Sequence, residues 1–109
     1  MIPVAFKAFL ARLLPATELG EIRWREAEAI SYFCNHNGHT LTLSRHFDYD
    51  REVSSIRFSI ETSGKITPFT VYNYEEADYS QMDGLFDAVI ANANEVHLDL
   101  DDFFADPQL

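Results

Sequence analysis

The sequence predicts an α+β fold in which an antiparallel sheet of about four to five strands has an N-terminal and a C-terminal helix packed on one face. Apolar residues recur with helical spacing near both ends of the chain, and two segments between them alternate apolar and polar residues around turn-forming sequences. Because amphipathic helices need an apolar surface to cover, the other sheet face is expected to be polar or to serve association. The length of 109 residues suits a single domain, which we expect to span residues 1–109.

The first element is expected to be a helix that starts near Pro3 and stops at Pro15. Lys7 and Arg12 fall on its outer side. Two cations are few for attraction to lipid, so a helix packed on the core is favoured over one on a membrane surface, and no membrane contact is expected. The apolar positions of its inner side are Ile2, Phe6, Phe9, Leu10, Leu13 and Leu14.

Residues 17–28 are ambiguous between strand and helix. Ile22 and Trp24 alternate with charged residues, as they would in a short strand, and Gly20 weakens a helix start at Thr17. The alternation favours a strand.

Two hairpins are expected in the middle of the chain. In the first, apolar residues alternate on both sides of residues 35–38, whose sequence Asn-His-Asn-Gly is typical of a turn. In the second, the sequence Thr-Ser-Gly-Lys at residues 62–65 connects a strand around Phe58 to a returning strand over residues 66–74. Pro68 has no N–H to donate, so the returning strand is expected at an edge of the sheet.

A second helix is expected after a cap at Asp78 or Ser80. Its apolar residues follow the i, i+3, i+4, i+7 pattern closely, which makes one face suitable for the core. Beyond it, residues 96–104 are expected to form a further short turn. The stripe consists of Met82, Leu85, Phe86, Val89, Ile90 and Ala93, and the tail offers Leu98, Leu100, Phe103 and Phe104 for docking.

Charge is distributed very unevenly along the chain. Eight basic and eighteen acidic residues give a net charge of -10, and every Lys and Arg lies at or before Lys65. Residues 66–109 hold ten acids and no Lys or Arg. Binding of nucleic acid by this half is disfavoured, because neutralising phosphates requires basic side chains.

The sequence offers no convincing catalytic set. Cys34, the only cysteine, falls on the apolar parity of its strand, which favours a buried thiol over a nucleophile. A single cysteine also excludes an internal disulfide and suits a reducing compartment, so a cytoplasmic location is expected. A metal site from Cys34, His36, His39 and His46 is disfavoured, because a turn directs these side chains differently. We therefore expect neither enzyme activity nor a cofactor or metal.

An acidic segment rich in tyrosine is the best candidate for a binding surface. Asp83 and Asp87 lie four residues apart on the helix, where like charges cost about 0.2 to 0.5 kcal/mol, and no basic residue is nearby in sequence. Tyrosines among acids are well suited to a protein interface. The expected partner-binding residues are Tyr72, Tyr74, Glu75, Glu76, Asp78, Tyr79, Asp83 and Asp87.

In size, acidity and lack of a catalytic set, the chain resembles small bacterial immunity proteins of polymorphic toxin and contact-dependent growth inhibition systems. The segment from Tyr72 to Asp87 and the Asp99-Leu-Asp-Asp tail carry this resemblance. It implies a partner-binding inhibitor whose acidic surface masks the basic cleft of a cognate toxin, such as a nuclease. On this interpretation, reversing Asp83 and Asp87 to lysine should keep the fold and weaken binding at least about tenfold.

An acidic secretion chaperone that binds an effector as a homodimer is the alternative, since such chaperones are also small, acidic, cytoplasmic α+β domains. Salt distinguishes the two functions, because screening slows a charge-steered inhibitor and leaves binding through an apolar groove intact. The oligomeric state is open at this point.

Overall fold

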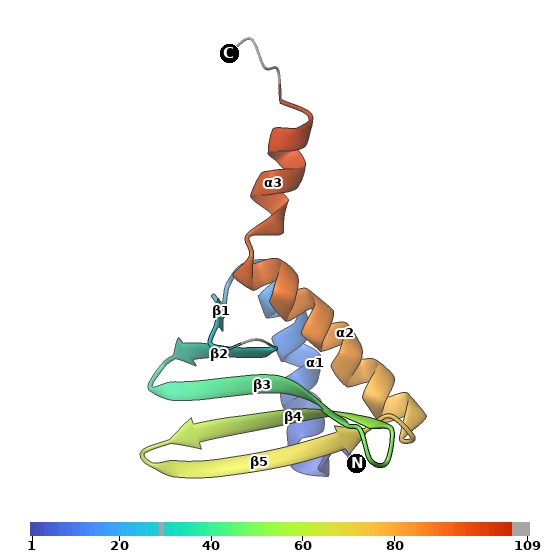
Figure 1. The fold of residues 1–109 in the computed structure, drawn as a ribbon. Coiled ribbons are helices and arrows are strands. Elements are labelled where there is room, and N and C mark those ends of the chain that lie inside the picture. The colour runs from blue at the N-terminus through green and yellow to red at the C-terminus, as the bar shows by residue number, and fades with distance from the viewer. Residues whose placement is uncertain (29, 106–109) are drawn as a thin grey trace.

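Five antiparallel strands form a single sheet in which each strand pairs with the next one in the chain, in the order β1-β2-β3-β4-β5 (Figure 1). The computed structural model describes residues 1–28 and 30–105. Within this part of the chain, one helix precedes the sheet and two follow it. The predicted α+β class is therefore confirmed.

The strands are longest in the interior of the sheet. β1 spans Arg25–Glu26, β2 spans Ser31–His36, β3 spans His39–Asp48, β4 spans Val53–Thr62 and β5 spans Lys65–Tyr72. β5 forms one edge of the sheet, as its proline predicted, because a residue without an N–H is tolerated where no further strand must pair.

Short turns connect the strands and set their register. Asn37 and Gly38 have φ of 51° and 77°, and Ser63 and Gly64 have φ of 52° and 81°. Positive φ at both central residues matches the twist of a two-residue hairpin, so each pair closes its hairpin tightly. The link between β3 and β4 is longer and begins at Asp48, whose Oδ1 accepts the backbone N–H of Asp50 at 3.0 Å.

Helices α1, Val4–Glu18, and α2, Glu76–Ala93, cover the same face of the sheet (Figure 1). The predicted stripe of α2 is confirmed, since four of its six members are buried and Ile90 and Ala93 pack against them. The strand residues that meet the helices alternate, as expected for a sheet covered on one face. They are Tyr32, Cys34, Leu41, Leu43, Ile56, Phe58, Phe69 and Val71.

The opposite face of the sheet is open and largely polar, as expected. On this side, Thr42 of β3 pairs with Ser59 of β4, and Arg57 of β4 pairs with Ser44 of β3 and with Thr70 of β5. Hydroxyl side chains dominate its centre, and no helix of the described chain covers it (Figure 1).

Two helix boundaries differ from the prediction. α1 continues through Pro15 to Glu18, because the turn after the proline is held by tertiary contacts: Thr17 is buried, and its hydroxyl accepts a hydrogen bond from Trp24 Nε1 at 3.1 Å. Residues 17–28 are accordingly neither one strand nor one helix. They contain the end of α1, a loop and the short β1.

α2 begins at Glu76, earlier than predicted, and neither Asp78 nor Ser80 caps it. The Asp78 carboxylate instead accepts the backbone N–H of Ile2 at 2.9 Å, so it joins α2 to the start of the chain. The side chain of Asp78, which the local sequence suggested as a helix cap, therefore makes a long-range contact instead.

The tail forms a third helix, α3, Val96–Phe103, where a short turn was expected. It extends away from the sheet and the other helices (Figure 1), and none of its residues is buried. Over residues 1–28 and 30–105, none of the helices combines the length and the apolar character needed to cross a bilayer.

Candidate protein-interaction surface

The predicted binding residues lie where β5 ends and α2 begins. Tyr72 is the last residue of β5, and a tight turn follows in which the N–H of Glu75 donates to the carbonyl of Tyr72 at 2.9 Å. This turn places Tyr72 and Tyr74 on one side, where their rings stack with centroids 5.4 Å apart and planes inclined by 7°. Both rings are exposed, Tyr74 by 69%. The pair therefore presents a rigid aromatic surface to solvent.

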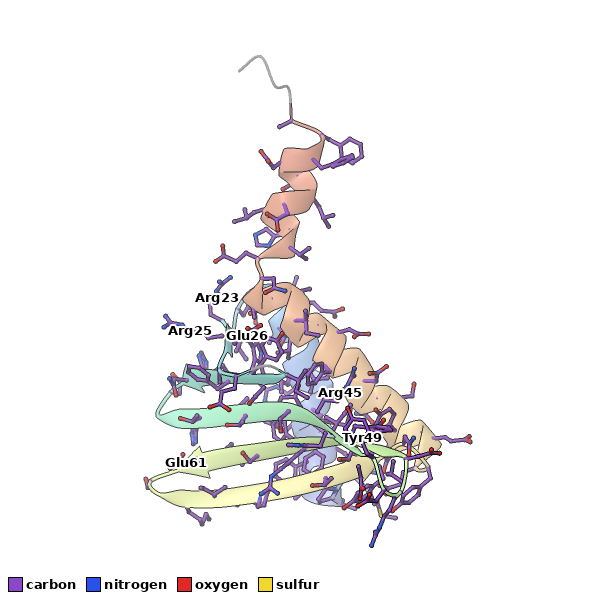
Figure 2. The ribbon with its side chains drawn as sticks, in the orientation of Figure 1. Arg23, Arg25, Glu26, Arg45, Tyr49 and Glu61 are labelled. Atoms are coloured by element: carbon purple, nitrogen blue, oxygen red, sulfur yellow. The ribbon has the colours of Figure 1, made fainter. Side chains whose placement is uncertain are left out.

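A second aromatic pair comes from the end of β3 and the link that follows it. Phe47 and Tyr49 meet edge to face at 4.7 Å, and Tyr49 is 83% exposed. Strand β4 brings the two pairs together, because Phe47 pairs with Ser54 and the next residue, Ser55, pairs with Tyr72. We call these four residues, Phe47, Tyr49, Tyr72 and Tyr74, the aromatic cradle; Figure 2 labels Tyr49 on the loop.

A hollow of about 370 Å³ lies at the cradle, at the end of the open sheet face. His46 and Arg51 contribute to its wall, together with Phe47, Tyr72 and Tyr74. The His46 Nε2 lies 2.9 Å from the Ser44 hydroxyl. The hollow thus combines aromatic faces with one acid, Asp48, one base, Arg51, and hydrogen-bonding groups, a mixture found in protein interfaces.

Two of the predicted acids, Glu75 and Asp78, accept hydrogen bonds from other parts of the chain. Glu75 accepts hydrogen bonds from the N-terminal ammonium of Met1 and from the backbone N–H of Tyr72, the latter at 2.8 Å. These donors favour the charged carboxylate and lower the pKa of Glu75. Asp78 accepts the N–H of Ile2. Both carboxylates therefore have partners within the chain.

Asp83 is also paired, and its partner lies far from it in the sequence. Arg45 of β3, labelled in Figure 2, forms an ion pair with Asp83. Its guanidinium lies 4.5 Å from the centre of the Phe86 ring. Arg45 occupies a strand position that faces the helices, which explains how it reaches α2. No basic residue lies near Asp83 along the sequence, as stated above, but the fold brings Arg45 to it. Tyr79 is half-buried against the core.

Glu76 and Asp87 remain as free acids of the predicted set. Both are exposed, and neither forms an ion pair within residues 1–28 and 30–105. Together with Tyr72 and Tyr74, they are the predicted residues whose side chains are open to a partner. The structure therefore brings half of the predicted set to a surface and assigns the other half to internal contacts.

Sequence reasoning gave no binding role to Phe47, Tyr49 or Arg51. Phe47 was counted among the alternating apolar residues of a strand, and it does lie in β3, but its place beside Tyr72 was missed. The sequence Phe-Asp-Tyr-Asp-Arg did contain a usable signal, since aspartates that favour turns alternate there with aromatics. Its closeness to Tyr72 depends on the pairing of three strands, which no local pattern reveals.

The residues considered for metal binding or nucleophilic attack do not converge. His36 and His39 pair across the hairpin turn, and His46 lies near the opposite end of β3. Among the described residues, no three His, Cys, Asp or Glu side chains are grouped as metal ligands. Cys34 is 1% exposed, and burial raises its pKa to about 11, so the thiol is protonated at neutral pH.

The Arg45–Asp83 pair leads to a testable difference between two neighbouring acids. Asp83→Lys is expected to lower the free energy of unfolding by about 1 kcal/mol, because it replaces a partly exposed ion pair with a repulsion. Asp87→Lys, one turn further along α2, should change it by less than about 0.5 kcal/mol. Urea denaturation of both variants measures this difference, and equal stabilities would show that the ion pair contributes nothing.

Comparison with known proteins adds no relative. No protein-family model, no curated protein and no solved structure matches the chain.

Proposed function

We propose that this chain is a non-catalytic inhibitor of the immunity type, which binds a cognate toxin and masks its basic active-site cleft. The observation that supports this function best is the exposed aromatic cradle at the start of α2, the helix that also carries Glu76 and Asp87, two exposed acids without an ion pair among the described residues. We call Tyr72, Tyr74, Glu76 and Asp87, with Phe47 and Tyr49, the proposed contact surface.

The physical chemistry of this surface suits a basic protein. Tyrosine supplies a large contact area with little conformational entropy to lose, and the stacked Tyr72–Tyr74 pair is already ordered. An arginine of the partner can lie against a tyrosine face and reach a carboxylate at its edge. Basic clefts that handle phosphate substrates, such as those of nucleases, contain such arginines.

The charge of the second half of the chain supports the same partner. Residues 66–109 carry ten acids and no Lys or Arg, and this excess attracts a basic protein from a distance. The same excess opposes direct binding to nucleic acid. A toxin with a basic cleft is therefore favoured over its nucleic-acid substrate as the direct partner.

A pull-down from the native host, with bound proteins identified by mass spectrometry at low and high salt, tests the proposal. The wild type is expected to recover a basic toxin domain. Glu76→Lys with Asp87→Lys should slow association about tenfold, because it removes steering charge without touching an internal ion pair. Glu28→Lys with Glu61→Lys is the matched control, with the same change of net charge at exposed sites away from the surface (Figure 2 labels Glu61).

A second function, the acidic secretion chaperone acting as a homodimer, is favoured by one observation. α3 exposes apolar side chains along its length, which is suited to contact with another chain. A complex with a secreted effector that resists high salt and survives both pairs of charge reversals would support the chaperone and count against the inhibitor.

A further inference from the structure

The helix α3 carries an apolar stripe that is largely exposed in the described part of the chain. Val96, Leu100 and Phe103 are spaced four and three residues apart, so they share one side, and Phe104 extends this side by contacting Phe103 at 4.9 Å. Leu100, Phe103 and Phe104 are exposed by 62%, 79% and 86%. Asp101 and Asp102 lie on other sides. An amphipathic helix of this kind needs a surface to cover, because eight residues are too few for a stable isolated helix.

The start of α3 is fixed so that the helix leads away from its own chain. Glu95 adopts a left-handed conformation with φ of 51° and forms an ion pair with Arg23, which also appears in Figure 2. This joint turns the chain between α2 and α3. The described molecule is 51 Å long in its longest direction, and α3 forms the projecting end (Figure 1).

An open groove of about 750 Å³ lies between α1, the loop that follows it and the β2–β3 turn, where His36 and Asn37 form part of its wall. Its apolar wall includes Phe9, Leu19 and Ile22, of which Phe9 and Leu19 are exposed by 37% and 74%. Arg12 and Glu21 supply its charged groups. Exposed apolar residues around a groove are the usual features of a helix-binding site.

Charge distinguishes α1 from the other helices. It carries two bases, Lys7 and Arg12, against one acid, Glu18, whereas α2 and α3 contain acids and no Lys or Arg. In a chain of net charge -10, α1 is thus the helix that repels an acidic helix least, and it contributes Arg12 to the groove. Asp99 borders the stripe of α3 and can face Arg12.

We propose that two copies of this chain exchange their α3 helices, so that the apolar stripe of each lies in the α1 groove of the other. Reciprocal exchange gives a two-fold symmetric dimer in which both stripes and both grooves are covered. The dimer does not rest on the proposed function. The aromatic cradle adjoins the N-terminal end of α2, and α3 follows its C-terminal end, 18 helical residues away.

Sedimentation velocity over a wide range of protein concentration tests the exchange. The wild type is expected to be a dimer. Leu100→Asp with Phe103→Asp should raise the dimer dissociation constant at least about a hundredfold, because it places charge on the stripe. Leu98→Asp is the matched control on the same helix, since Leu98 is exposed by 52% and lies outside the stripe, and it should remain a dimer.

The groove is tested separately and by complementation. Leu19→Asp, at an exposed position, should also give a monomer. A mixture of the Leu19→Asp chain with the Leu100→Asp, Phe103→Asp chain should form mixed dimers, because one intact helix and one intact groove remain in such a pair. Charge exchange is a further check: Arg12→Asp should weaken the dimer, and Arg12→Asp with Asp99→Arg should restore it.

Three results would overturn the exchange: a monomeric wild type, a dimer that persists in the Leu100→Asp, Phe103→Asp variant, and a mixture of the two defective chains that stays monomeric. Far-UV circular dichroism of each variant shows whether it is folded, and all the substituted side chains are exposed. Capture of a toxin through the aromatic cradle is measured independently, so a failed dimer leaves the proposed function standing.

Discussion

Asn92→Ala is expected to lower the free energy of unfolding by about 3 kcal/mol, because the side chain of Asn92 satisfies three backbone groups in the interior. Its Oδ1 accepts the N–H of Trp24 at 2.7 Å, and its Nδ2 donates to the carbonyls of Thr17 and Ile22 at 2.9 and 2.7 Å. Asn92 is 8% exposed, so water cannot fully replace these bonds. The loss removes the hydrogen bonds of the Trp24 N–H and the Ile22 carbonyl, whereas the Thr17 carbonyl still accepts the N–H of Gly20 at 3.2 Å.

Urea denaturation followed by the fluorescence of Trp24 measures this effect, since Trp24 is buried and is the only tryptophan. Asn94→Ala is the matched control, because Asn94 lies two residues further on and is exposed, and it should change stability by less than about 0.5 kcal/mol. A loss below about 1 kcal/mol for Asn92→Ala would show that the network contributes little.

Tyr72→Ala with Tyr74→Ala is expected to weaken binding of the captured toxin at least about a hundredfold, or about 2.7 kcal/mol. Both rings are exposed, so their removal takes little from the core. In a complex, they would be enclosed by the partner, where aromatic side chains provide much of the binding energy.

Isothermal titration calorimetry with the purified toxin measures this loss. Ile66→Ala is the control, because Ile66 is an exposed apolar residue of β5, 57% exposed, away from the cradle. It should leave the affinity unchanged. If the tyrosine variant binds as tightly as the wild type, the interface lies elsewhere, and α3 or the open sheet face becomes the next surface to vary.

Local sequence patterns predicted most helices and strands of the fold, but not the helix α3 and not every boundary. The stripe of α2 and the turn at Asn37 and Gly38 were predictable, because each depends on residues close in sequence. The end of α1 was not, since Pro15 ends a helix by local rules and the buried Thr17 holds the next turn through Trp24. Tertiary contacts overrode a local preference there.

At the candidate surface, too, some features follow from local sequence and others depend on residues that are distant in the chain. Exposed tyrosines among acids were recognised, since composition and spacing are local. Whether an acid is free depends on residues distant in sequence: Arg45 is 38 residues from Asp83, and Ile2 is 76 residues from Asp78. Phe47 and Tyr49 joined the surface for the same reason, through the pairing of β3 with β4 and of β4 with β5.

The enzymatic activity of the captured toxin, measured while this protein is added, tests the proposed inhibition most directly. Wild-type protein is expected to abolish the activity at equimolar amounts, and the Tyr72→Ala, Tyr74→Ala variant should require a large excess. A captured partner whose activity is unchanged by saturating wild-type protein would contradict the inhibitor and leave a binding protein of another kind.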